Sequence, residues 1–173
     1  RMLEVAAHYY HFDGISQINE QNRALITALR DELTTPASVE KGLDLPIYWG
    51  NRNWHPMLVD TLQQMRDDGV KRALTFVTSA MSSYSGCRQY LEDIQRARAE
   101  LGEGAPEVHK LRAFYNHPGF IEAMQSRVQE AVNQVDGQST LIVFTAHSIP
   151  LSMAGGCPYV EQLEESSRLV MES

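Results

Sequence analysis

A histidine follows an apolar run in the segment FTAHSIP (144–150). The preceding residues, STLIVFTA (139–146), are typical of a strand buried on both faces of a sheet. Because the ordinary pKa of an imidazole is about 6.5, His147 could accept a proton or bind a metal ion at neutral pH. A histidine before a proline is also a common turn residue, so this motif alone leaves a chemical and a structural role open.

Three other apolar runs are followed by aromatic, hydroxyl, cationic or imidazole side chains. These segments are YWGNRNWHP (48–56), FVTSAMSSYSGC (76–87) and AFYNHP (113–118). In open parallel sheets, ligands bind beyond the carboxyl ends of the strands. The sequence therefore predicts that these three segments and FTAHSIP lie at one edge of a sheet and line a site there.

Strand-like and helix-like segments alternate along the chain. Apolar, β-branched runs predict strands over 45–50, 72–80, 110–115 and 139–146. Apolar stripes at helical spacing predict helices over 15–33, 55–69, 87–102, 117–135 and from about residue 161. This alternation is typical of βαβ units, so we expect an α/β fold with a Rossmann-like open parallel sheet flanked by helices. The polar connector DGQS (136–139) is the best candidate for a domain boundary.

Composition excludes several classes of protein. The 173 residues suffice for one domain, or for one domain and part of another. A net charge of −7 argues against a nucleic-acid partner. The sequence contains no apolar run near the roughly 20 residues of a transmembrane helix and opens without a signal-peptide pattern. Since it begins without Met and ends within a helical pattern, we expect it to be part of a longer protein.

Common catalytic signatures are missing from the sequence. There is no GxGxxG after a strand and no GxxxxGK[ST], so nucleotide binding is not supported. GxSxG is also missing. HYYH (8–11) holds two imidazoles three residues apart, but no third metal ligand is in register with them. Cys87 and Cys157 form no CxxC pair, which suits a reducing cytoplasm and excludes a disulfide framework.

Four motifs resemble those of the ferrochelatases, enzymes that insert ferrous iron into a porphyrin. FTAHSIP resembles the family's AHS[LI]P signature, and YYHFDGIS (9–16) looks like its Tyr-x-x-x-Gly-Gly-x-Ser porphyrin loop. YWGNRNWHP resembles the YxGxRxxxP segment, and FVTSAMSSYSGC resembles the serine-rich loop that leads into a helix. Order and spacing agree along nearly the whole chain, and family members are about twice as long.

The resemblance implies a class II chelatase fold with a truncated second lobe. Residues 1–135 would be the N-terminal lobe without its first strand, and residues 136–173 would be the first strand and helix of the C-terminal lobe. His147 would be the catalytic residue that faces the pyrrole nitrogens and binds Fe2+, the metal substrate. Metal insertion removes two pyrrole protons, and an imidazole is a suitable acceptor.

The resemblance also implies contacts with the porphyrin. By the resemblance, Arg52 would contact a propionate, for which a guanidinium is well suited. The residues that match the family's porphyrin-binding positions are Tyr9, Ser16, Arg52, Asn53 and Ser85. Asp13 replaces the first glycine of the usual pair, so the porphyrin loop is expected to differ in shape. The family's acidic partner of the histidine, a glutamate of the C-terminal lobe, is outside this chain.

Cys87 has two interpretations. Some ferrochelatases carry a two-iron iron–sulfur cluster, and some bacterial members have a ligand in a Ser-Tyr-Ser-x-Cys stretch like SYSGC (83–87). The resemblance offers Cys87 as such a ligand, with the remaining ligands outside the chain. A buried, inert cysteine at the start of a helix is the alternative. Cys157 is expected to be structural or incidental.

The leading hypothesis is therefore insertion of ferrous iron into protoporphyrin IX or coproporphyrin III in haem biosynthesis, with the choice between the two left open. The alternatives are a cobalt or nickel chelatase for another tetrapyrrole and a tetrapyrrole-binding module without turnover. We expect a cytoplasmic monomer or homodimer that binds a porphyrin and no nucleic acid. Transient contacts with neighbouring enzymes of the haem pathway are also expected.

Overall fold

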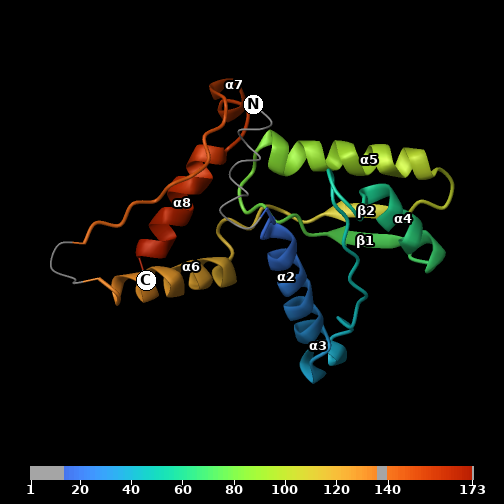
Figure 1. Cartoon of the computed structure of the whole chain (residues 1–173), viewed down its shortest axis with the longest axis horizontal. Coiled ribbons are helices and arrows are strands. Elements are labelled where there is room, and N and C mark those ends of the chain that lie inside the picture. Colours follow the sequence, from blue (N-terminus) through green and yellow to red (C-terminus); the bar gives the residue numbers. More distant parts are fainter. Residues whose placement is uncertain (1–13, 136–139, 173) are drawn as a thin grey trace. The chain divides into compact units, whose positions relative to one another are not determined.

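The computed structural model describes residues 14–135 and 140–172 (Figure 1). The chain divides into two compact units, Arg1–Trp49 and Gly50–Ser173. The domain boundary expected between residues 135 and 136 adjoins residues outside the described ranges, so it stays a prediction. Within these ranges, no helix is both long and apolar enough to cross a membrane.

The first unit contains helix α2 (Ile18–Leu33) and the short helix α3 (Pro36–Glu40). Thr35 begins α3 because its hydroxyl accepts a hydrogen bond from the backbone N–H of Ser38, and a proline occupies the first helical position. Arg30 donates to the carbonyl oxygen of Ile47 at 3.4 Å, which connects α2 with the segment 45–49. That segment is neither helix nor strand, so the strand predicted over 45–50 is wrong.

The second unit is built on a parallel βαβ arrangement. Strand β1 (Arg72–Thr75) pairs with β2 (Glu107–Lys110) in register, with Arg72 opposite Glu107. Between them lie the π-helical turn η2 (Tyr84–Arg88) and helix α5 (Gln89–Leu101). Parallel strands need such a crossover, and the α/β class is confirmed.

Helix α4 (Leu58–Asp67) precedes β1 and packs against α5. The apolar core of this part of the unit contains Leu62 from α4 and Ile94 and Ala97 from α5. The predicted helices over 55–69 and 87–102 are therefore confirmed, with ends that differ by a few residues. Their apolar stripes identified the buried faces correctly.

Helices α6 (Pro118–Val132) and α8 (Tyr159–Met171) pack against each other, and a short helix α7 (Leu151–Ala154) precedes α8. The side chain of Gln125 in α6 donates to the carbonyl oxygen of Leu169 in α8 at 3.1 Å. Before α6, the ring of Phe114 stacks on Phe76 with centroids 5.0 Å apart. This contact joins the segments that leave the two strands.

The strands are shorter than the sequence predicts. The strand expected over 72–80 ends at Thr75, and the one expected over 110–115 lies at 107–110. Pairing nevertheless continues irregularly, because the N–H of Leu111 donates to Thr75 and that of Phe114 donates to Ala80. The carboxyl ends of both strands therefore stay together, as the site prediction requires.

The strand predicted over 139–146 is wrong. Its described residues, 140–146, are neither helix nor strand. Leu141 is 83% exposed and Val143 is 70% exposed, although the apolar run indicated burial on both faces. A strand needs a neighbour for its backbone hydrogen bonds, and no described segment pairs with this one.

Candidate functional site

Arg52 is held by groups from two later segments. Its Nε donates to Oδ2 of Asp93 in α5, and its Nη1 lies 3.5 Å from the carbonyl oxygen of Ser85. The guanidinium carbon is 4.6 Å from the centroid of the Tyr90 ring, within range of a cation–π interaction. Since only 15% of the Arg52 side chain is exposed, these contacts fix its position. The structure thus brings together two of the predicted porphyrin-binding residues, Arg52 and Ser85.

Asp93 joins this cluster, although no sequence motif pointed to it. Its carboxylate is 10% exposed and also accepts a hydrogen bond from Arg96 one turn later in α5. Burial raises the pKa of this carboxyl, but the hydrogen bonds and charges of Arg52 and Arg96 lower it further, so its pKa lies below the ordinary 3.8. Two guanidinium groups and one carboxylate leave the cluster with a net positive charge, which suits an anionic ligand.

The serine loop, residues 79–86, leads into the turn η2. The hydroxyl of Ser83 accepts from the N–H of Gly86 at 2.9 Å, and its carbonyl oxygen accepts from Cys87. A side chain at Gly86 would place its Cβ 2.6 Å from Oγ of Ser79, so Ser79 or the loop would have to shift to accommodate it. Ser85 is exposed, with its Oγ 3.3 Å from that of Ser83. Turns with π-helical geometry occur frequently at functional sites.

The described residues do not fit an iron–sulfur cluster. Such clusters need about four cysteine ligands, sometimes with histidine replacing cysteine. Cys87 is half-buried in η2, whereas Cys157 donates to the carbonyl oxygen of Met153 in another part of the unit. In the described ranges, no group of three or more His, Cys, Asp or Glu side chains could hold a metal ion. Cys87 as a cluster ligand therefore stays a prediction.

His147 lies on the surface of the second unit. Its carbonyl oxygen accepts a hydrogen bond of 3.1 Å from the hydroxyl of Tyr159 in α8, which holds the backbone at this position. The residue itself is exposed, so its imidazole is accessible to a ligand. Asn53 is also exposed, next to Trp54. Ser16 is half-buried in the first unit, shortly before α2, and Tyr9 lies outside the described residues.

Comparison with known proteins gives a consistent result. The family model described as ferrochelatase matches residues 1–173. A ferrochelatase of Rhodopirellula baltica is 56% identical over 175 residues, which is 100% of this chain and 48% of that protein. A coproporphyrin III ferrochelatase of Mycobacteroides abscessus is 50% identical over 152 residues, covering 88% of this chain and 43% of that protein.

A coproporphyrin III ferrochelatase of Nocardia farcinica is 46% identical over 180 residues, covering 98% of this chain and 50% of that protein. The chain therefore spans about half the length of the curated relatives that it matches. The family model and the Rhodopirellula baltica relative both cover the whole chain, so the similarity includes all four sequence motifs.

Proposed function

Because this chain belongs to the ferrochelatase family, we propose that the natural protein containing it inserts ferrous iron into a porphyrin in haem biosynthesis. The observation that carries the proposal is the match of the whole chain, residues 1–173, to the family model. The reaction breaks two pyrrole N–H bonds, forms four iron–nitrogen bonds and releases two protons. The iron stays ferrous throughout, so no oxidant or reductant is needed.

His147 is the proposed catalytic residue. Its neutral imidazole would either accept one pyrrole proton or ligate the incoming Fe2+, because a ring nitrogen that has taken up a proton cannot bind a metal. The exposure of the residue would let both released protons pass on to water. The positive cluster of Arg52, Asp93 and Arg96 would bind a propionate. Ser85 and Asn53, which belong to the matched sequence motifs, would donate further hydrogen bonds to the porphyrin. Tyr9 and Ser16 are proposed to contact the porphyrin as well.

For the substrate we propose coproporphyrin III. Relatives that are 46–50% identical to this chain are named coproporphyrin III ferrochelatases. This porphyrin carries four propionates, whereas protoporphyrin IX carries two, so it would use a positive cluster more fully. The preference for coproporphyrin III over protoporphyrin IX should therefore depend on the charge of the cluster of Arg52, Asp93 and Arg96.

Other features of the complete protein are also proposals. We propose a cytoplasmic location, supported by two cysteines that are both free. Residues 136–173 are proposed to begin a second lobe. Cys87 would be a ligand of an iron–sulfur cluster only if residues beyond this chain supplied the other ligands. We also propose that the complete protein is a monomer or homodimer that contacts neighbouring haem-pathway enzymes transiently.

The test is anaerobic iron insertion by the complete natural protein, followed by the absorbance of the porphyrin. The variants are His147→Ala and, as a matched control, His109→Ala, which removes an exposed histidine paired with Glu107 in β2. We expect His147→Ala to lower the insertion rate by about 10²–10⁴-fold with porphyrin binding retained. His109→Ala should leave both unchanged.

Each other outcome contradicts a named part of the proposal. Equal rates in the wild-type protein and in His147→Ala would remove His147 as the catalytic residue. Porphyrin binding without insertion by the wild-type protein would indicate a carrier. Faster insertion of cobalt or nickel than of iron would indicate another chelatase. A preference for protoporphyrin IX over coproporphyrin III would reject the proposed substrate alone.

A further inference from the structure

Helix α8 has a polar buried face. Gln162 is 8% exposed and Ser166 is 7% exposed, and both share this face with the apolar Val170. Tyr159 lies three residues before Gln162, so it extends the same face toward the start of the helix. Buried polar groups are costly without hydrogen bonds, so these side chains are expected to have partners. Those partners show which segments of the chain this face of α8 holds in place.

Gln162 uses both ends of its amide on one residue of the serine loop. Its Oε1 accepts from the backbone N–H of Ser82 at 2.6 Å, and its Nε2 donates to the hydroxyl of Ser82 at 3.2 Å. Ser82 lies 80 residues earlier in the chain. The pair of bonds fixes both the position and the orientation of the loop at this residue.

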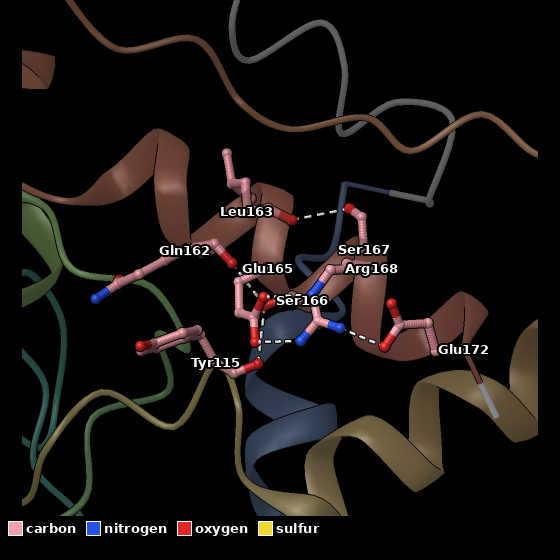
Figure 2. Close-up of polar contacts among 8 residues, drawn as sticks. All are labelled: Tyr115, Gln162, Leu163, Glu165, Ser166, Ser167, Arg168 and Glu172. Atoms are coloured by element: carbon pink, nitrogen blue, oxygen red, sulfur yellow. Dashed lines mark hydrogen bonds and ion pairs between the residues drawn. The ribbon is translucent and has the colours of Figure 1, made fainter.

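Ser166 connects α8 to the segment that follows β2. Its Oγ lies 2.8 Å from the carbonyl oxygen of Tyr115 and 2.8 Å from that of Gln162 (Figure 2). A hydroxyl has one hydrogen to donate, so these two acceptors share it. Among the described residues, the neighbouring Ser167 donates within its own helix, to the carbonyl oxygen of Leu163. Ser166 and Ser167 are therefore a matched pair, one tertiary and one local.

Tyr159 completes the set, since its hydroxyl donates to the backbone of His147 at 3.1 Å. Three side chains on one face of α8 thus bind three segments: the serine loop, the residues after β2, and the segment with the proposed catalytic histidine. In each case at least one bonded group of the segment is a backbone atom. Such backbone contacts hold the path of the chain, and at Ser82 the side-chain hydroxyl is held as well.

We propose that α8 is a positioning helix for the porphyrin site. Tyr159, Gln162 and Ser166 fix the geometry of three segments relative to one another, and they act through those segments without touching substrate. The inference rests on the proposed function, in that these segments meet the porphyrin. It assigns different consequences to different contacts, because Gln162 governs the serine loop and Tyr159 governs the backbone at His147.

The first measurement is hydrogen–deuterium exchange in the complete protein, which needs no activity. Gln162→Met keeps the length of the side chain and removes both bonds to Ser82, so exchange of the serine loop should accelerate about tenfold. Tyr159→Phe should accelerate exchange around His147 only. Ser167→Ala should change neither segment. Equal, unlocalised acceleration in all three variants, or none in any, would overturn the proposal.

The second measurement separates porphyrin binding from iron insertion. Gln162→Met should raise the Kd of the porphyrin about tenfold, whereas Tyr159→Phe should lower the insertion rate at saturating porphyrin with little change in Kd. Gln162→Glu keeps an acceptor for the N–H of Ser82 and should restore part of the affinity. If these residues only stabilised the fold, the variants would reduce the amount of folded protein without separating the change in porphyrin Kd from the change in insertion rate. That result would count against the proposal.

Failure of the proposed function gives a different pattern. If the wild-type protein inserts no iron, the enzymatic proposal fails. Hydrogen–deuterium exchange and porphyrin titration then still decide the role of α8, because neither needs activity. If Gln162→Met yields no folded protein, Ser166→Ala beside Ser167→Ala is the remaining comparison. There, faster exchange after β2 in Ser166→Ala alone supports positioning, and identical exchange in both rejects it.

Discussion

The substitution Asp93→Asn tests whether the buried cluster is held together by charge. It removes the carboxylate that Arg52 contacts and leaves a side chain of the same shape. Arg52 would then be a guanidinium with 15% of its side chain exposed, without the carboxylate that is its ion-pair partner among the described residues. Arg96 would lose the same partner, but its side chain is 72% exposed and water can solvate it. The cost therefore falls mainly on Arg52.

The magnitude follows from these surroundings. Removing one partner of a fully buried ion pair costs about 3–5 kcal/mol. Arg52 keeps the ring of Tyr90 and the carbonyl oxygen of Ser85, and part of its side chain contacts water. We therefore expect Asp93→Asn to lower the free energy of unfolding by about 2 kcal/mol.

Urea unfolding of the complete protein measures this loss, with Glu165→Gln as the control. Glu165 accepts from Arg168 in α8, but that pair lies on the surface, and its loss should have no measurable effect. A double-mutant cycle of Asp93→Asn with Arg52→Met should give a coupling of about 1 kcal/mol or more. Equal effects of Asp93→Asn and Glu165→Gln, or no coupling, would refute the reasoning.

The same cluster predicts a dependence on pH. The pKa of Asp93 is lower in the folded protein than its ordinary value of 3.8, so the unfolded chain binds the proton more readily. The stabilisation by Asp93 is therefore complete above this ordinary value and is lost as the pH falls below it, toward the folded pKa. The difference in stability between wild type and Asp93→Asn should be constant near neutral pH and shrink in that acidic range.

Two further predictions concern the serine loop and the turn after it. Gly86→Ala places a Cβ 2.6 Å from Oγ of Ser79, so it should displace the loop and weaken porphyrin binding, measured by titration; unchanged affinity would contradict this. The pKa of Tyr84 is raised above its ordinary value of 10.0, mainly by the hydrogen bond that its hydroxyl donates to Glu92 and next by the negative charge of Glu92. Glu92→Gln should lower the pKa of Tyr84, seen by ultraviolet titration of tyrosinate, and no shift would argue against the contact.

The helices could be predicted from the sequence because their signal is local. Apolar residues at helical spacing, together with Gly and Pro at the ends, placed α4, α5, α6 and α8 within a few residues. A strand depends on a neighbour that the local pattern does not contain. The run 139–146 has the composition of a buried strand, yet Leu141 within it is mostly exposed because no described strand lies beside it.

The candidate site shows the same division. Motif matches brought Arg52 and Ser85 into one set, and the structure places them within reach of each other. Asp93, Gln162 and Ser166 were missed because each interrupts an otherwise apolar helical face. Asp93 lies three residues after Tyr90 and four before Ala97, so it occupies the buried side of α5. A polar residue in such a stripe signals a buried partner, but the partner lies far away in sequence.

Two helices therefore perform a task that the short sheet cannot. Strands β1 and β2 pair over only four residues each, and beyond them the chain runs as irregular loops. Side chains from α5 fix Arg52, and side chains from α8 fix Ser82, Tyr115 and His147. Since these contacts join loops to helices rather than helices to one another, removing one should alter the geometry of the site before it unfolds the second unit. Loss of function without loss of fold is thus the expected consequence of small changes on the polar faces of α5 and α8.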